Sequence, residues 1–446
     1  MSDALPLPPR PNIEQYRKLA KELKHASQSQ NPDDILNWAK SWVEKLARLQ
    51  GVKLTPEARR KVDHEVEWFL RNWSEWRKKK DAPERCTLTD TQFFVARTHG
   101  FASWPRFAKH IEAIVKTDSP VAQFETAVDA IVNGDLKRLD QLLTKNPRLV
   151  KERSTRDHQS TLLHYVSANG VEDFRQKTPK NIVEITKRLL KAGADVNAES
   201  EAYGGRSTTL GLTATSWHPE DAGVQLALMD LLIGHGAIIE GPDSGSAVNG
   251  CLHNGRGEAA EFFASRGAHL DLEGAAGVGR LDIVKSFFTK NGRLKSPATR
   301  KQMTDGFAWA CQFGRIDVVE FLLDHGVRAN EELKHHGGTG LHWAAWGGHS
   351  DLVQLLLARG TKVDSRDKLY GGTPLDWALY AWGNTTLEGN YAEVAKLLLK
   401  AGAQINPDWF KDDYERARAI KKIQSDPKMN EILGELLSKP TPGLSE

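Results

Sequence analysis

The stretch Gly338–Asp364, GTGLHWAAWGGHSDLVQLLLARGTKVD, decides the fold. Its first part, LHWAAWGG from Leu341, predicts a short helix whose alanines let neighbouring helices approach closely. After a glycine turn, SDLVQLLLARG from Ser350 has apolar residues at i, i+3 and i+4, which predicts a second, amphipathic helix. Gly360 suits the left-handed residue that ends such a helix. A pair of this kind cannot cover its apolar stripe alone, so the pattern predicts stacking against further copies.

Copies of this unit recur along the chain. Trp309, Trp343 and Trp377 follow one another at intervals of 34 residues, and Gly326 and Gly360 are also 34 residues apart. Less regular copies lie upstream, in the order AVDAIVNGDLKRLDQLLTKNP, TLLHYVSANG, TTLGLTATSW and NGCLHNGRGEAAEFFASRGAHLD. A period of this length indicates a solenoid of helix pairs that bury their apolar faces against each other.

The unit resembles the ankyrin repeat, whose pattern begins with T-P-L-H-x-A-A and ends with G-A and N. The matching residues are Thr339–Ala345 (TGLHWAA), Thr373–Ala378 (TPLDWA) and Leu189–Asn197 (LLKAGADVN). The resemblance covers residues 121–406 and implies an all-α solenoid of about eight repeats. It also implies that the first helices and the hairpin-like fingers line a concave face, which usually binds the partner.

The segments on either side lack the repeat. Residues 12–117 show amphipathic helical patterns, and 88–114 resembles the helical N-terminal segment that precedes ankyrin arrays in many bacterial proteins. We expect three parts: an N-terminal helical domain at 1–117, the solenoid at 118–406, and capping helices with a tail at 407–446. Six tryptophans at helical spacing are predicted to form the core of the first domain: Trp38, Trp42, Trp68, Trp73, Trp76 and Trp104.

The composition restricts the class of partner. Lys plus Arg number 61 and Asp plus Glu 58, a formal net charge of +3, which argues against a dedicated nucleic-acid or polybasic membrane binder. The N-terminus has no apolar signal-peptide core, and nowhere do 18 apolar residues run together. The wide spacing of Cys86, Cys251 and Cys311 argues against a disulfide framework or a zinc knuckle. We expect a monomeric cytoplasmic protein without a cofactor or metal.

The period is broken at identifiable places. The second, third and eighth repeats carry extra residues between their two helices, around 171–181, 216–225 and 383–392. All three insertions fall at the rim where the inner helix turns outward. The fifth repeat instead loses its finger, because AHLDLEGAAGVGRLDIV from Ala268 leads almost directly into the next helix. Two interpretations stay open: a groove reshaped for a partner, or drift in repeats that need not stay regular.

Aromatic side chains gather on the first helices of the regular repeats. One slot holds Trp309, Trp343 and Trp377, and one turn later come Phe313, Trp346 and Tyr380. Packed helices lie about 8–10 Å apart, so we expect a strip that crosses three repeats and faces solvent in the groove. The alternative, tryptophans wedged between repeats, stays open. Exposed aromatic rings on a rigid scaffold act as anchors for proteins, sugars or flat ligands.

Polar candidates surround this strip. The fingers supply His335, His336 and Tyr370, which we add to the partner-binding set. The two histidines fit a polar fingertip better than a metal site, because their spacing fixes no third ligand. Catalysis needs a matched acid and base, and the candidates are Glu273, Asp305, His253 and His342. For His342 the resemblance implies another role, in which the imidazole ties one finger to the next by hydrogen bonds.

Binding is the function that the sequence favours. The groove of the fourth to eighth repeats is predicted to recognise a protein, a peptide or a small-molecule ligand. The alternative is a hydrolase- or lyase-like enzyme acting on a sugar-like or aromatic small molecule in the same groove. The sequence contains no nucleophile-elbow, phosphate-loop, zinc-helix or dinucleotide-binding motif that would support that alternative. A third hypothesis is a structural adaptor whose N-terminal domain docks elsewhere.

Overall fold

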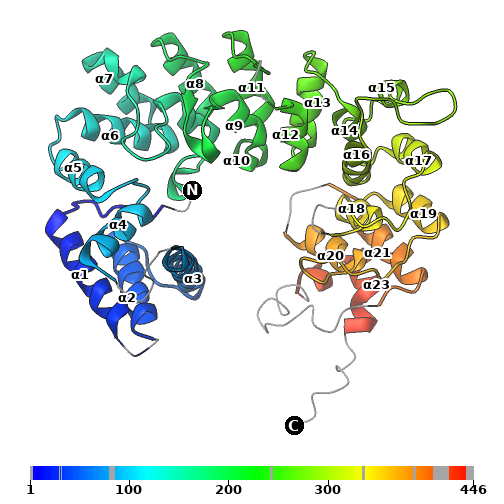
Figure 1. Cartoon of the computed structure of the whole chain (residues 1–446), viewed down its shortest axis with the longest axis horizontal. Coiled ribbons are helices and arrows are strands. Elements are labelled where there is room, and N and C mark those ends of the chain that lie inside the picture. The colour runs from blue at the N-terminus through cyan, green and yellow to red at the C-terminus, as the bar shows by residue number, and fades with distance from the viewer. Residues whose placement is uncertain are drawn as a thin grey trace. The chain divides into compact units, whose positions relative to one another are not determined.

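The computed structural model describes residues 4–29, 31, 33–79, 86–241, 245–333, 337–384, 388–404 and 421–437. Contacts divide the chain into two compact units, Met1–Ile239 (unit 1) and Glu240–Glu446 (unit 2). Both units are built of helices (Figure 1). The strands in the described residues are β1 (Glu199–Ser200) and β2 (Ser207–Thr208), which pair antiparallel in one finger of unit 1.

Unit 1 begins with five helices that share one core. They are α1 (Ile13–Gln28), α2 (Asp33–Leu49), α3 (Pro56–Lys78), α4 (Leu88–Thr98) and α5 (Trp104–Ile114). Side-chain caps fix where four of them begin, because a side-chain oxygen accepts a hydrogen bond from an N–H of the first turn at Asn12, Thr55, Thr87 and Ser103. The prediction that six tryptophans form this core is confirmed: Trp42 and Trp73 are buried, and Trp38, Trp68, Trp76 and Trp104 pack against them partly buried.

Three helix pairs follow in unit 1. Their inner elements are α6, the 3-10 helix η2 and α9, and their outer helices are α7, α8 and α11. The bounds are α6 (Pro120–Val132), α7 (Leu136–Lys145), η1 (Pro147–Lys151), η2 (Leu162–Ser167), η3 (Asp173–Arg175), α8 (Ile182–Lys191), η4 (Ala202–Gly204), α9 (Thr209–Thr215), α10 (Trp217–Asp221) and α11 (Gln225–Gly234).

Unit 2 contains five more pairs, followed by α23 (Pro427–Leu437), which packs on α21. The bounds are α12 (Ala247–His253), α13 (Gly257–Ser265), α14 (Leu272–Gly277), α15 (Leu281–Ser286), α16 (Arg300–Gln312), α17 (Ile316–Asp324), α18 (Gly340–Trp346), α19 (Ser350–Ala358), α20 (Pro374–Asn384) and α21 (Tyr391–Lys400). The even-numbered helices α12 to α20 form an inner layer, in which each contacts the next (Figure 1). With the pairs of unit 1, the predicted all-α solenoid of about eight repeats is confirmed.

Glycines bring the first inner helices of unit 2 unusually close together. A Cβ atom added at Gly306 of α16 would lie 2.8 Å from Ala276 Cβ and 3.2 Å from Glu273 Cα. One added at Gly277 of α14 would lie 2.4 Å from a methyl group of Leu252 on α12. Side chains from these three helices can therefore meet on one face.

The breaks in the period lie where the sequence analysis places them. The insertion at 171–181 contains η3 and the one at 216–225 contains α10, each between the inner and outer helix of its pair. The third, at 383–392, lies between α20 and α21 and includes residues outside the described part of the chain. The short connection 266–271 joins α13 to α14, so the finger of the fifth repeat is missing as predicted.

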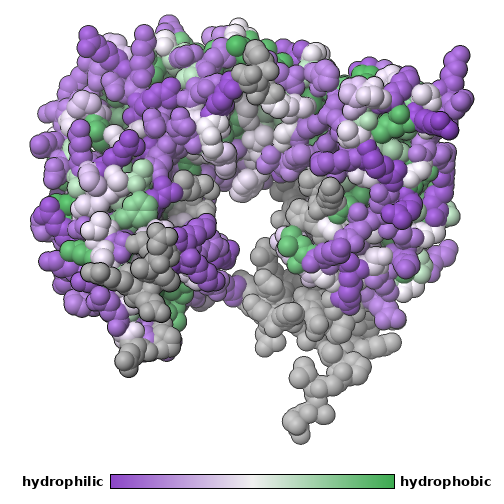
Figure 2. Space-filling model, in the orientation of Figure 1, coloured by the Kyte–Doolittle hydropathy of each residue, from purple (hydrophilic) through white to green (hydrophobic). Residues whose placement is uncertain are grey.

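The surface on the face drawn in Figure 2 is mainly hydrophilic, and hydrophobic residues appear there as scattered patches. Exposed large apolar or aromatic residues of the described chain include Trp217, Leu369, Tyr370 and Tyr380. Within the described residues, no helix has the length and apolar character needed to cross a bilayer.

Candidate functional site

Four tryptophans form a continuous strip on the inner helices α16, α18 and α20. The ring centroids of Trp309 and Trp343 are 5.7 Å apart with planes at 63°, and those of Trp343 and Trp377 are 5.1 Å apart at 88°. Trp346 contacts Trp377 edge to face at 6.1 Å. Edge-to-face pairs in this range contribute about 0.5–1.5 kcal/mol each beyond the burial of area. We name these four rings the tryptophan ladder.

The expectation that the ladder faces solvent is wrong for three of its rings. Trp309, Trp343 and Trp377 are only 3, 6 and 8 % exposed. Small residues such as Ala344 leave room between adjacent inner helices, and each indole fills that room instead of projecting from it. For the shared slot, the other interpretation of the sequence, tryptophans wedged between repeats, is the correct one.

Carboxylates hold two of the buried indoles. Trp309 Nε1 donates to Glu273 Oε1 at 3.0 Å, and Trp377 Nε1 donates to Asp367 Oδ2 at 3.1 Å. The Asp367 carboxylate also accepts from three backbone N–H groups of its own finger, those of Leu369, Tyr370 and Gly372. Burial raises the pKa of Asp367, but these donors outweigh it and the pKa lies below its ordinary value. One carboxylate therefore joins a finger to the ladder.

The ladder ends in a pair of rings that solvent can reach. Trp346 is partly buried and Tyr380 is 54 % exposed, and the two rings stack at 6.0 Å with planes at 20°. Tyr370, in the finger before α20, is 72 % exposed. These three residues are the members of the predicted binding set that the structure leaves open to a partner.

The rest of that set divides into two groups. Phe313 ends α16 partly buried and packs toward α13, where a Cβ atom added at Gly257 would lie 2.7 Å from its ring. This contact makes Phe313 part of the packing between two repeats. His335 and His336 lie outside the described residues.

Three of the four catalytic candidates converge at the Trp309 end of the ladder. His253 Nε2 donates to Glu273 Oε1 at 2.6 Å, and Lys301 Nζ donates to Asp305 Oδ2 at 2.5 Å. The His253 and Trp309 rings are 5.4 Å apart, so this polar group continues the ladder. The side chain of His253 is 41 % exposed, whereas those of Glu273 and Asp305 are 5 % and 1 % exposed.

The His253–Glu273 hydrogen bond shifts the pKa values of the two side chains in opposite directions. This bond raises the pKa of His253 against the effect of burial, and the charge of Asp305 adds to the increase. Burial alone would raise the pKa of Glu273, but the donors His253 and Trp309 outweigh it and lower the pKa. The pair therefore favours a histidinium beside a carboxylate.

His342, the fourth candidate, has the role that the resemblance implies. The ring is fully buried, its Nδ1 accepts from the Thr339 N–H at 3.0 Å, and its Nε2 donates to the Gly372 carbonyl at 3.2 Å. Burial lowers the pKa of His342 to about 4, which keeps the ring neutral. Because both ring nitrogens are hidden and occupied, the structure contradicts a catalytic role. His164 repeats the arrangement in unit 1.

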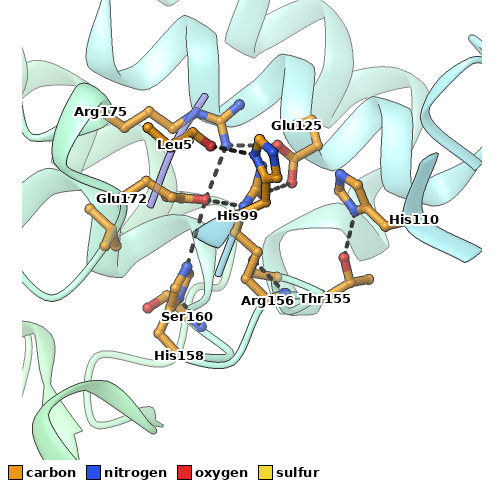
Figure 3. Close-up of polar contacts among 12 residues, drawn as sticks. Leu5, His99, His110, Glu125, Thr155, Arg156, His158, Ser160, Glu172 and Arg175 are labelled. Carbon is orange, nitrogen blue, oxygen red and sulfur yellow. Dashed lines mark hydrogen bonds and ion pairs between the residues drawn. The ribbon is translucent and has the colours of Figure 1, made fainter. Parts of the chain in front are cut away.

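A second group of polar residues, which the sequence analysis missed, lies in unit 1. Arg156 Nη1 donates to Glu125 Oε1 at 2.8 Å, and Arg175 Nη1 donates to Glu125 Oε2 at 2.7 Å. Arg156 Nε lies 2.9 Å from Glu172 Oε1, and Arg175 Nη1 lies 3.4 Å from the same oxygen. Figure 3 shows the two carboxylates on opposite sides of the two guanidinium groups. We name these four residues the charge cluster.

All four side chains of the charge cluster are almost wholly buried. Burial alone would raise the pKa of Glu125, but Arg156 and Arg175 lower it to about 2. The same two cations outweigh burial at Glu172 and hold its pKa well below the ordinary value. Buried ion pairs are often no more stabilising than apolar residues of similar size, so stability alone does not account for the cluster. Strongly perturbed groups gather at functional sites.

Contacts around the cluster join the N-terminal helices to the first repeats. His110 Nδ1 of α5 lies 2.7 Å from Thr155 Oγ1, and Arg97 of α4 forms an ion pair with Asp157. The Arg156 guanidinium lies 5.4 Å from the centroid of the Phe101 ring (Figure 3 shows its surroundings). The predicted domain boundary after residue 117 therefore falls between segments that contact each other directly.

The members of the charge cluster are far apart in the sequence. They come from α6, the loop before η2 and the insertion at 171–181, with 50 residues between Glu125 and Arg175. One signal was present, because Glu125 lies on the buried face of α6 between apolar neighbours. A charged residue in that position requires a buried partner, but the sequence does not indicate which one.

Comparison with known proteins identifies the repeats. A family model described as ankyrin repeats (3 copies) matches residues 272–367 and 307–408. No curated protein matches the sequence closely enough to count as a relative. Among solved structures, the human ASB11 ankyrin repeat domain is similar at 21 % identity, over 63 % of this chain and 99 % of that chain, with a TM-score of 0.30. Residues 272–408 of the chain therefore consist of ankyrin repeats.

Proposed function

We propose that unit 2 binds a protein partner through the inner helices α18 and α20 and the finger that precedes α20. Ankyrin repeats in general mediate contacts between proteins, and the matched repeats include these elements. Fold membership does not select a surface, so the surface is argued from its side chains. The Trp346–Tyr380 pair and Tyr370 are the proposed anchors.

The observation that carries this proposal is the exposed Tyr380 ring stacked on Trp346 at the end of a buried ladder. Binding energy at protein interfaces concentrates in a few aromatic or arginine side chains held on a rigid support. Here Trp377 supports Trp346 edge to face, and its indole is itself bonded to Asp367. A partner would therefore bind aromatic side chains that are already held in place, so little side-chain entropy is lost on binding.

Quantitative affinity capture from an extract of the source cells tests this surface. The double variant Trp346→Ala/Tyr380→Ala is compared with wild type and with Trp217→Ala, which removes an exposed tryptophan of unit 1. We expect the double variant to lose a defined set of proteins, each by about 30-fold, as for a hot spot of about 2 kcal/mol. The control variant should retain that set. Identical sets from all three proteins would refute the proposal and favour an adaptor that binds through other elements.

Acid–base catalysis is the second candidate, and the His253–Glu273 hydrogen bond of 2.6 Å favours it. A substrate can reach the His253 ring directly, whereas Glu273 and Asp305 are almost wholly buried. In an enzyme of this kind His253 would transfer the proton and Glu273 would hold its ring and charge. The burial of both carboxylates makes the paired-acid mechanism of sugar hydrolysis the weaker reading.

Turnover distinguishes catalysis from binding. If the pair is catalytic, Glu273→Gln should lower kcat on any substrate found by about 100-fold and leave its affinity nearly unchanged. Unchanged turnover in Glu273→Gln and in His253→Gln would remove the enzyme hypothesis.

We also propose that the protein is a cytoplasmic monomer; its three free cysteines, Cys86, Cys251 and Cys311, fit a reducing compartment. Sedimentation of the purified chain tests the oligomeric state, and a mass of two or more chains at micromolar concentration would contradict a monomer. Fractionation of the source cells tests the compartment.

A further inference from the structure

A cavity of about 590 Å³ in unit 1 is lined by three members of the charge cluster, Glu125, Arg156 and Arg175. Its other walls include Val115 after α5, Phe174 of η3 and residues 6–11. Small-molecule sites typically measure about 300–1,000 Å³ and combine apolar walls with a few convergent polar groups. The size and the lining of this cavity both fit that description.

The segment 4–11, which we name the strap, is fixed in place by its backbone. The Leu5 N–H donates to the Thr98 carbonyl at 2.7 Å, and the Leu5 carbonyl accepts from His99 Nδ1 at 2.9 Å. The strap residues that line the cavity are mostly prolines: Pro6, Leu7, Pro8, Pro9, Arg10 and Pro11. Proline has no backbone N–H, so this wall presents ring carbons and carbonyl groups and few backbone donors.

The buried side chains of the lining have a hydrogen-bond donor to spare and no acceptor. Both oxygens of Glu125 accept from a guanidinium group, and the three nitrogens of Arg175 are bonded to carboxylates. Arg156 Nη1 donates to Glu125, and Arg156 Nε forms an ion pair with Glu172 without hydrogen-bond geometry. Arg156 Nη2 makes no hydrogen bond to any described residue. A ligand that fits must bring an acceptor to Arg156.

Charge points to the same chemistry. The lining contains the cations Arg10, Arg156 and Arg175 and the anions Glu125 and Asp129, which leaves an excess of one positive charge. Glu172 does not line the cavity and is already paired with both buried arginines. Arg10 is exposed, so its charge is available to a ligand.

We propose that this cavity binds a small organic carboxylate with an apolar body. The carboxylate accepts from Arg156 Nη2 and faces Arg10, and the apolar body packs against Val115, Phe174 and the strap prolines. Guanidinium–carboxylate contacts are among the strongest hydrogen bonds in proteins, which gives the site a preference for an acid over its amide. This site lies in unit 1 and is independent of the proposed protein-binding surface in unit 2.

Calorimetric titration of the full-length protein tests the site with three acids and their matched amides. The acids are hexanoate, 3-phenylpropionate and indole-3-butyrate, each tested up to about 10 mM, where millimolar binding is measurable. We expect at least one acid to bind saturably and about tenfold more tightly than its amide. Equal binding of acid and amide, or no saturable binding of any acid, overturns the proposal.

Two variants place the binding in the cavity. Arg10→Gln changes an exposed side chain and should weaken the acid about fivefold while leaving its amide unchanged. Val115→Trp places an indole ring at a half-exposed position of the cavity wall and should abolish binding of the acid and of its amide. Arg138→Gln, on the exposed side of α7, is the matched control and should bind as wild type does. Binding that survives Val115→Trp in a protein with an unchanged unfolding midpoint also overturns the proposal.

Discussion

The charge cluster and the tryptophan ladder connect neighbouring helix pairs by different chemistry. In the ladder, each ring contacts the ring of the next repeat, so every contact joins two adjacent copies of the same unit. In the charge cluster, Glu125 forms ion pairs with both arginines, and each arginine forms ion pairs with both glutamates. Loss of one ring weakens one junction, whereas loss of one charge leaves several buried groups uncompensated. Regular repeats can thus be joined pairwise, while the irregular first repeats depend on one shared network.

The largest effect is expected from removing a single charge. Arg156→Met leaves Glu125 and Glu172 each short of a cation and should lower the free energy of unfolding of unit 1 by about 3–5 kcal/mol. Arg188→Gln, which breaks the partly exposed pair with Asp140, should cost less than about 1 kcal/mol. Hydrogen exchange of unit 1 amides under native conditions measures both values. Equal small effects would mean that the cluster is not an interdependent network.

Truncating one ring of the ladder should have a slightly smaller effect, confined to unit 2. Trp343→Ala removes a buried indole that touches Trp309 and Trp377, and should cost about 3–4 kcal/mol. The exposed Trp217→Ala in unit 1 should cost less than about 1 kcal/mol. Hydrogen exchange resolved by segment measures the loss. Destabilisation of unit 1 by Trp343→Ala would contradict pairwise junctions.

Acid should destabilise unit 1 through the buried histidines near the charge cluster, of which His99 is one. Burial lowers the pKa of His99 to about 4 from an ordinary value of 6.5. Between these pH values the unfolded chain binds a proton that the folded protein excludes, so the stabilisation is complete above about pH 6.5 and is lost as the pH falls towards 4. One such group contributes a slope of about 1.4 kcal/mol per pH unit.

His99→Gln should therefore reduce the pH dependence of unit 1 stability by about 1.4 kcal/mol per pH unit between pH 6 and 4.5. The glutamine amide can still donate to the Leu5 carbonyl but does not titrate in this range. His342→Gln in unit 2 is the matched control and should leave the slope of unit 1 unchanged. Denaturant unfolding at several pH values gives the slopes. An unaltered slope in His99→Gln would show that His99 is protonated in the folded protein.

The smallest effect on stability is expected at the open end of the ladder. Tyr380→Ala removes a ring that is more than half exposed and should change the free energy of unfolding by less than about 0.5 kcal/mol. This variant then separates binding from folding, because partner capture can be measured on a protein of unchanged stability. A loss above about 2 kcal/mol would assign Tyr380 to the packing of unit 2.

The sequence predicted the regular part of the molecule well because repetition places equal residues in equal positions. The interval of 34 residues between Trp309, Trp343 and Trp377 was enough to bring their rings into one strip. It was not enough to predict their burial. Whether a ring faces solvent or the neighbouring helix depends on how closely the inner helices approach, and that distance is set by small residues in the adjacent repeats.

The charge cluster shows where such reasoning stops. Arg156 and Glu172 lie in a loop and an insertion, so no period fixes their positions relative to Glu125. The sequence predicted that His253, Glu273 and Asp305 lie around the aromatic strip, but it gave no distances between them. Close approach at Gly306 supplies the missing geometry. The predicted domain boundaries at 117 and 406 stay predictions.

The contacts of His110 with Thr155 and of Arg97 with Asp157 bear on how this protein could be recombined. A chimaera joined at residue 118 would graft the N-terminal helices onto a foreign array and strand Glu125, Arg156, Glu172 and Arg175 on the donor side. A transplant that carries residues 4–175 moves the helices and their ionic partners together. The natural unit of exchange is therefore longer than the repeat pattern suggests.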